Sequence, residues 1–195
     1  MKTIKTLLLA TLVALNFSCS KSDDSPAVAP PVVTPPVSGP VVPATGSYIF
    51  ATAEGAFSTL NLAGQHAVTG NVIGTGNNRI FYFVGGGSNG ELPSSPNYIY
   101  RSITIQLGSS INAVGTYAFD STTSSKAVFS YLSRPSSTMV DTVYSTQTCA
   151  GTSGTVTITA ISDTMVEGTF SFTGKNDGCA LSKTVTAGSF RFVAS

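Results

Sequence analysis

The sequence predicts an all-β protein: a single antiparallel β-sandwich or meandering barrel domain behind a signal peptide and a proline-rich stalk. Two observations support this fold class. Short runs in which apolar and polar residues alternate recur from residue 47 to residue 195, with the period of two that is typical of strands burying one face. Gly, Asn, Ser and Pro separate most of these runs, and no helical pattern interrupts them, as in sandwiches and barrels.

Eight of the runs precede residue 149. In residues 98–107, Ile103, Ile105 and Leu107 share one face, while Ser, Thr and Gln side chains lie on the other. The glycine-rich run VGGGSNG at residues 84–90 lacks the Lys-Ser or Lys-Thr that completes a phosphate-binding loop, so we expect a mobile loop there. The eight predicted strands cover residues 47–53, 58–64, 66–73, 79–84, 98–107, 115–120, 126–132 and 139–146.

Residues 149–192 give the firmest structural prediction, three consecutive antiparallel strands. Val156, Ile158 and Ala160 alternate with threonines, and the run from residue 166 to residue 172 places Val, Gly and two Phe on one face. A second hairpin leads to a third strand that ends near residue 192. The period of two predicts that all three strands bury one face.

The register of the first hairpin predicts a disulfide. A tight turn at residues 163 and 164 pairs Ser162 with Met165 and places Cys149 opposite residue 178, next to Cys179. A disulfide needs α-carbons about 4.4–6.8 Å apart, and an exported protein is exposed to oxidising conditions. The alternative is two free thiols or a metal pair, which requires further ligands, and the only histidine is His66.

Residues 1–18 predict a secretory signal. Lys2 and Lys5 precede an apolar stretch, TLLLATLVAL, that is too short to span a bilayer comfortably. The segment resembles a bacterial lipoprotein signal, in which the cysteine after the cleavage site is lipidated, although Asn16 and Phe17 depart from the usual leucine-then-small pattern. The resemblance implies lipidation of Cys19; the alternative is ordinary cleavage with Cys19 as a bystander.

The residues after Cys19 indicate the location of the protein and its spacing from the membrane. Cys-Ser-Lys-Ser-Asp-Asp-Ser resembles the start of many Bacteroidota lipoproteins, in which an acidic run implies export to the outer face of the outer membrane. Seven of the ten prolines then fall before residue 47, a composition typical of an extended, semi-rigid spacer. We expect a signal peptide at 1–18, a lipidated cysteine and stalk at 19–46, and an all-β domain at 47–195.

The charge balance of residues 47–195 argues against nucleic acid as a partner. Seven Lys or Arg residues are matched by seven Asp or Glu residues, without the basic footprint that phosphate binding requires. The expected partner is the membrane, through the lipid anchor.

Patterns of catalysis and metal binding are weak, and we predict no catalytic residue, no metal site and no cofactor. A Ser-His-Asp arrangement would have to use His66, which we interpret as a surface residue at a strand start. The acidic residues are scattered, and only folding could bring Glu54 near Glu91, or Asp120 near Asp141, at the about 5–9.5 Å that a glycosidase needs.

Tyrosines give the one positive indication of binding. Exposed rings beside hydroxyl side chains suit stacking on a glycan or a protein ligand; the alternative is core packing with a hydrogen-bonded phenol. The tyrosines concerned are Tyr82, Tyr98, Tyr100, Tyr117, Tyr131 and Tyr144.

Three short sequences resemble the Asp-(Ser/Thr)-apolar acceptor of the general O-glycosylation system of Bacteroidota. The resemblance implies Ser121, Thr142 and Thr164 as acceptors. Thr164 fits best, because the predicted hairpin turn exposes it.

The C-terminal third resembles a Bacteroidota lipoprotein domain family of unknown function. The similar segments are GTVTITAI from residue 154, GTFSFTG from residue 168 and KTVTAGSF from residue 183. The family implies an exported β domain and supplies no catalytic residues. We therefore expect an outer-membrane lipoprotein with a non-catalytic domain that binds a ligand or serves envelope structure. The alternative is a hydrolase acting on glycans or peptides.

Overall fold

The computed structural model describes residues 45–53, 55–59, 66–133 and 138–195. They belong to one compact unit, Gly39–Ser195, and its core is built from this unit's own side chains. The predicted signal, Cys19, most of the stalk, Glu54 and most of the predicted strand at 58–64 lie outside the described residues. No helix among the described residues is long and apolar enough to cross a membrane.

The described chain forms eleven strands and one 3-10 turn, Gly76–Asn78. The strands are β1 Tyr48–Thr52, β2 Ala56–Ser58, β3 His66–Ile73, β4 Ile80–Ser88, β5 Ile99–Leu107, β6 Gly115–Phe119, β7 Lys126–Ser133, β8 Val140–Ser145, β9 Ser153–Ile161, β10 Met165–Lys175 and β11 Ser182–Val193.

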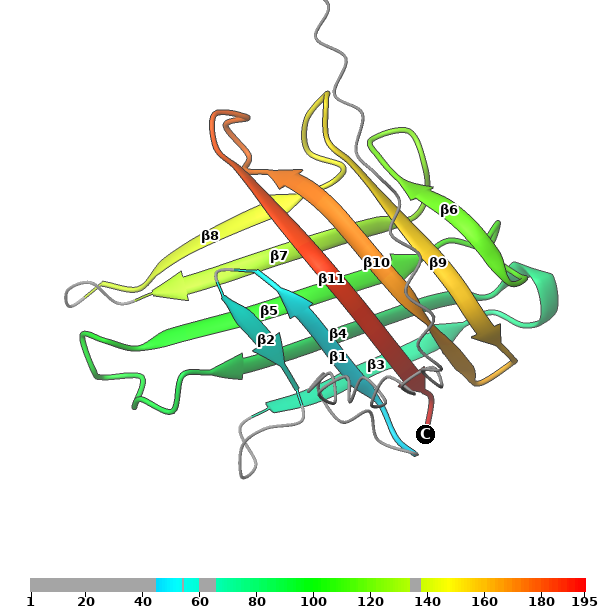
Figure 1. Cartoon of the computed structure of the whole chain (residues 1–195), viewed down its shortest axis with the longest axis horizontal. Helices are drawn as coiled ribbons and strands as arrows, with labels where there is room; N and C mark the ends of the chain where they lie inside the picture. The colour runs from blue at the N-terminus through cyan, green and yellow to red at the C-terminus, as the bar shows by residue number, and fades with distance from the viewer. Residues whose placement is uncertain (1–44, 54, 60–65, 134–137) are drawn as a thin grey trace, which may run out of the picture. The chain divides into compact units, whose positions relative to one another are not determined.

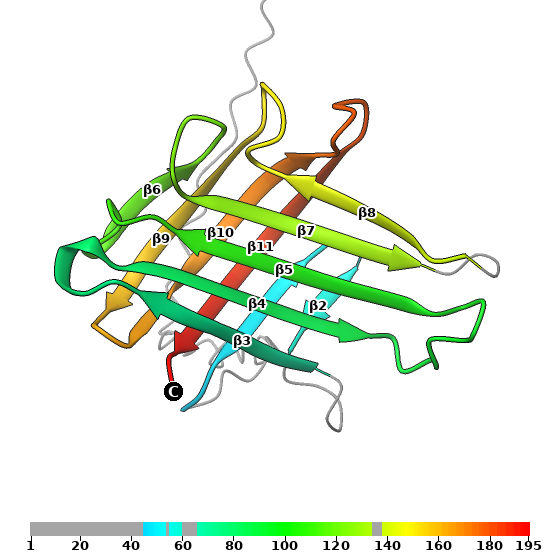
Figure 2. The ribbon, with the colours of Figure 1, turned by 180° about the vertical axis from the view of Figure 1, so that it is seen from behind.

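All pairings are antiparallel and join the strands into one sheet that folds back on itself. Its main path runs β2-β1-β11-β10-β8-β7-β5-β4-β3, while β9 pairs with both β10 and β6. The path turns between its two halves at a single bridge, Lys175 with Ser145. One layer therefore contains β3, β4, β5, β7 and β8, and the strands of the other cross it at an angle (Figures 1 and 2). The all-β prediction is confirmed: the sheet makes two facing layers and nearly closes into a barrel.

Phenylalanine rings fill the space between the layers. Phe83 of β4 lies 5.1 Å from both Phe190 and Phe192 of β11, measured between ring centroids. Phe83 and Phe190 are fully buried. The face predicted for residues 98–107 is also correct, because Ile103, Ile105 and Leu107 are buried.

The first C-terminal hairpin has the predicted turn, but a bulge shifts the predicted register. Ser162 N–H donates to the Met165 carbonyl at 2.8 Å. Farther along, Glu167 pairs with Ala160 but Gly168 pairs with Ile158, so one extra residue of β9 opposes β10, as in a β-bulge. The expectation that Ala160 lies on the buried face was wrong: beyond the bulge it is Ile161 that packs against the core.

The glycine-rich run is not a mobile loop. Gly85, Gly86 and Gly87 are buried residues of β4. A β-carbon on Gly85 would come within 2.8 Å of the Ile49 and Thr59 side chains, so glycine lets the facing layer approach the strand closely. The glycine-rich composition favoured a loop, but these glycines belong to a strand because the two layers pack closely at this point.

Candidate functional site

The loop between β4 and β5 and the end of β7 together form a surface lined by tyrosine and asparagine side chains. Asn89 holds this loop in shape, because its amide Nδ2 donates to the Asn97 carbonyl at 2.8 Å and its Oδ1 accepts from the Ile99 N–H at 3.2 Å. A turn closes the loop tip, with Ser95 N–H donating to the Leu92 carbonyl at 2.8 Å. The backbone around Tyr98 is thereby fixed before any ligand arrives.

Tyr98 separates two open depressions, which together we call the tyrosine groove. The larger has a volume of about 510 Å³ and the smaller about 270 Å³. The larger is lined by Asn89, Pro96, Asn97, Tyr98, Ile99, Tyr131 and Ser133, and the smaller by Ser88, Glu91, Leu92, Pro93, Tyr98 and Tyr100.

The tyrosines of the groove are held by packing but keep part of their surface open. Tyr98, Tyr100 and Tyr131 are all half-buried. Tyr131 packs against the core cluster, and Tyr100 lies across Gly86, where a β-carbon would come 2.1 Å from the phenolic oxygen. Burial raises the pKa of Tyr100 above its ordinary value, and the electrostatic effect of Tyr98 adds to the rise. The Tyr100 phenol is therefore a neutral hydrogen-bonding group at neutral pH.

The chemistry of the groove is aromatic and amide-rich, with little charge. Glu91 is the single acidic residue among its lining residues, which include no Lys, Arg or His. Rigid rings beside amide and hydroxyl groups can pack against an apolar ligand face and hydrogen-bond to its polar edge.

A third depression lies on the outer face of β9, β10 and β11 and differs from the tyrosine groove in chemistry. Its volume is about 320 Å³, and its lining includes Ser153, Thr155, Ser171, Thr173 and Thr184. Several of these hydroxyls are engaged with each other; Thr173 and Thr184, for instance, are 2.9 Å apart. This surface offers hydroxyl groups but no exposed aromatic ring for stacking.

The remaining tyrosines divide between core and surface. Tyr144 is buried, and the Tyr117 hydroxyl donates to the Ala113 carbonyl at 2.9 Å. Tyr82 is exposed on β4 and lines neither part of the groove. Some of these tyrosines therefore pack in the core and others are open to a ligand, and only folding separates the three groove tyrosines from the rest.

The structure joins Cys149 and Cys179 in a disulfide with α-carbons 5.8 Å apart. Cys149 lies between β8 and β9, and Cys179 lies in the loop between β10 and β11. The pairing of β9 with β10 ends at Ser153 and Thr173, so the two cysteines meet through these loops and not as neighbours in the paired strands. The bridge ties together the ends of strands beside the point where the two layers join.

Asp120 and Asp141, one of the carboxylate pairs considered for catalysis, each have hydrogen-bond partners of their own. Hydrogen bonds to the Asp120 carboxylate hold its pKa below the ordinary value. The Thr122 hydroxyl has the largest effect, and the N–H groups of Thr122 and Thr123 add to it. Asp141 accepts a hydrogen bond from the Ser130 hydroxyl at 2.7 Å. No cluster of three metal-ligating side chains is found within the part of the chain that the structure describes. His66 begins β3, as its sequence context predicted.

The three O-glycosylation candidates differ in accessibility. Ser121 and Thr164 are exposed in turns, whereas Thr142 is half-buried within β8. Asp163, beside Thr164, forms an ion pair with Arg79, whose side chain is only 10% exposed. Sequence analysis gave Arg79 no such role, because a lone basic residue at the start of a strand does not reveal a partner 84 residues away.

Residues 99–194 match a protein family described as a domain of unknown function, DUF6252. The match runs from β5 through β11 and includes all three segments on which the family resemblance rested. The chain is therefore similar over about half its length to a domain whose function is unknown. No curated protein matches the chain, and no solved structure does.

Proposed function

We propose that this chain is an exported lipoprotein whose β domain binds a glycan without chemical conversion. Cys19 carries the lipid that anchors the chain in the outer membrane, and residues 20–46 act as the stalk of a domain that faces the cell surface. The support for anchoring is the sequence itself: a basic start, a short apolar stretch, and a cysteine followed by Ser-Lys-Ser-Asp-Asp. Several acyl chains on one residue give stable attachment, since each buried methylene contributes about 0.8 kcal/mol.

The tyrosine groove is the observation that supports binding. A sugar ring has an apolar C–H face, which can stack on Tyr98, and hydroxyl edges, which the Asn97 amide and the Ser133 hydroxyl can hydrogen-bond. Because Asn89 already fixes the loop, little conformational entropy is lost on binding. The shallow, open form of both depressions suits a chain of sugar units that passes across the surface.

Hydrolysis is the less favoured function. A glycosidase places two carboxylates about 5–9.5 Å apart across the bond that it cleaves, whereas Glu91 is the single acid lining the groove. The groove supplies stacking and hydrogen bonding but not a pair of acids.

We also propose that the exposed turns accept O-linked glycans, first at Thr164 and then at Ser121. Both hydroxyls lie in turns and are exposed, as an enzyme that modifies the folded chain requires. Thr142 is a poorer acceptor because its strand pairs with β7.

Replacing Cys19 with alanine is expected to move the protein from the membrane fraction to the soluble fraction. The substitution removes the sulfur to which the lipid is attached. The measurement is cell fractionation followed by immunoblotting, with Ser20→Ala as the matched control that should remain in the membrane. Membrane retention of Cys19→Ala would contradict lipid anchoring at this residue.

Replacing Tyr98 with alanine is expected to weaken glycan binding at least about tenfold, a loss typical of a central aromatic contact. The domain 39–195 would be screened on a glycan array, and affinity for bound glycans measured by titration calorimetry. Tyr82→Ala is the control, since Tyr82 is exposed but lines neither depression. A domain that binds no glycan on the array, or binds equally well without Tyr98, would argue against the proposal.

A further inference from the structure

Strand β3 is the free edge of one layer. It pairs with β4 through all eight of its residues, from His66 with Gly87 to Ile73 with Ile80. No second strand pairs with it in the described part of the chain, and it ends the strand order of the sheet. Figure 2 shows β3 at the border of its layer, beyond β4. Among the described residues, its outer backbone groups therefore have no strand partner.

The features that normally protect an edge strand are missing from β3. Its sequence, HAVTGNVI, contains no Lys, Arg, Asp, Glu or Pro, which are the residues that commonly block pairing at an exposed edge. Thr69, Gly70 and Asn71 at its centre are exposed. Ile73 is 54% exposed, an unusual position for a large apolar side chain.

The residue pattern of β3 is symmetric about Gly70. Val68 and Val72 lie two residues to either side and both pack against the core. Thr69 and Asn71, next to Gly70, are polar and exposed, and the next pair on the same face, Ala67 and Ile73, is apolar. From Ala67 to Ile73, the pattern of apolar and polar residues therefore reads the same in both directions along the strand.

We propose that two copies of this chain associate through their β3 strands, paired antiparallel about Gly70. In this register Val68 faces Val72 of the second copy, on the core side, because opposed residues in a strand pair lie on the same face. On the outer side, Thr69 faces Asn71 of the second copy and Ala67 covers Ile73. A two-fold contact of this kind is self-complementary, as closed dimers require.

The symmetry of the pattern favours a second copy over an unrelated strand. A peptide from another protein would need apolar and polar residues in the same order to match both faces of β3. A second β3 has this order already, because the pattern is symmetric. A single pair of eight-residue strands makes an interface smaller than those of tightly bound dimers, so association is expected to depend on protein concentration. This inference goes beyond glycan binding and does not depend on it.

The test compares one substitution at two positions by sedimentation velocity of the domain 39–195 over a range of concentrations. Thr69→Lys places a charge on the edge strand and is expected to shift the dimer to monomer. Thr169→Lys makes the same change at an exposed site of β10, an interior strand, and is expected to leave the dimer unchanged. Far-ultraviolet circular dichroism checks that both variants are folded.

Cross-linking tests the register independently. The double variant Ala67→Cys with Ile73→Cys is expected to form a covalent dimer on mild oxidation. In the proposed register, the thiol at position 67 of one copy lies opposite the thiol at position 73 of the other. A monomeric wild type at every concentration, a dimer that survives Thr69→Lys, or an absence of cross-linked dimer would each overturn the proposal.

Discussion

Phe83→Ala is expected to lower the free energy of unfolding by about 3–5 kcal/mol, the usual cost of removing a buried phenylalanine. Phe83 is fully buried and packs against Phe190 and Phe192 from the facing layer. Its loss would leave a cavity at the point where the two layers meet. Urea denaturation of the domain 39–195 measures the change.

The neighbouring residue provides the matched control for this experiment. Tyr82 lies on the same strand but points to the outer face and is 38% exposed, so Tyr82→Ala is expected to cost less than about 1 kcal/mol. Equal losses for the two variants would contradict the assignment of the inner and outer faces of β4.

Removing the disulfide is expected to lower the free energy of unfolding by about 2–4 kcal/mol. The bridge closes a loop with a sequence separation of 30 residues, and its loss restores conformational freedom mainly to the unfolded chain. The double variant Cys149→Ser with Cys179→Ser would be compared with the wild type by thermal and urea denaturation.

Single variants separate the covalent effect from packing. Cys179 is exposed and Cys149 is buried, so Cys179→Ser should show the loss of the bridge alone, and Cys149→Ser should cost slightly more. Intact-mass analysis of the wild type showing two free thiols, or unchanged stability of Cys179→Ser, would refute the bridge.

Local alternation in the sequence was enough to predict the strands but not their detailed pairing. The pattern of residues 66–73 matches β3, and the turn before Met165 is placed correctly. The bulge in β9 could not be predicted, because an extra unpaired residue leaves both the composition and the approximate alternation intact. Gly85 was misinterpreted for a related reason: the need for glycine comes from Ile49, a residue of the facing layer.

The candidate site was only partly visible in the sequence. Tyr98, Tyr100 and Tyr131 were among the tyrosines singled out, but nothing in the sequence distinguished them from Tyr144, which is buried. What defines the groove is the loop that Asn89 organises, and that role depends on hydrogen bonds to residues eight and ten positions away. An Asn-Gly pair followed by two prolines indicates a turn but does not indicate its partners.

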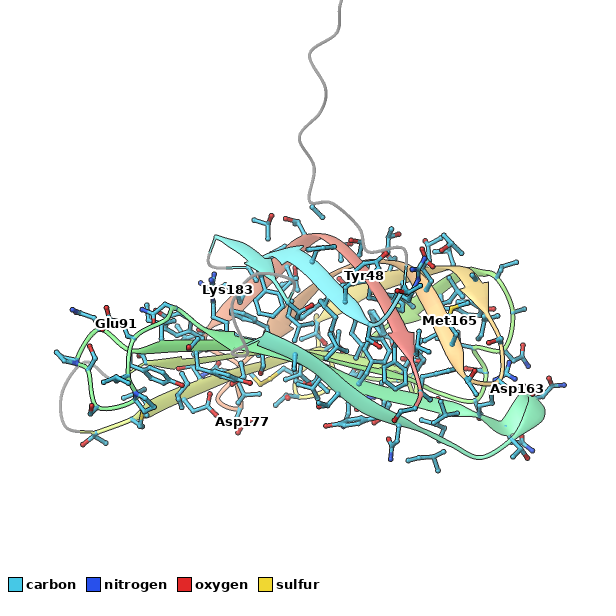
Figure 3. All side chains as sticks on the ribbon, turned by 90° about the horizontal axis from the view of Figure 1, so that it is seen from below. Tyr48, Glu91, Asp163, Met165, Asp177 and Lys183 are labelled. Atoms are coloured by element: carbon cyan, nitrogen blue, oxygen red, sulfur yellow. A yellow bond between two sulfur atoms is a disulfide. The ribbon has the colours of Figure 1, made fainter. Side chains whose placement is uncertain are left out.

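The tyrosine groove and the proposed glycan acceptor Thr164 lie at different ends of the domain. Figure 3 places Glu91, beside the tyrosine groove, and Asp163, beside the proposed acceptor Thr164, at opposite ends. A glycan attached to Thr164 would therefore leave the groove open. Modification and ligand binding can then operate independently on one domain.

Chemical-shift mapping by NMR tests binding in the tyrosine groove most directly. The isotopically labelled domain 39–195 would be titrated with the glycan that the array selects. We predict the largest shifts in residues 88–100 and 131–133, the two segments that contain the residues lining the groove. The largest shifts on the hydroxyl-rich face around Thr155, Thr173 and Thr184 would contradict the assignment of the binding site.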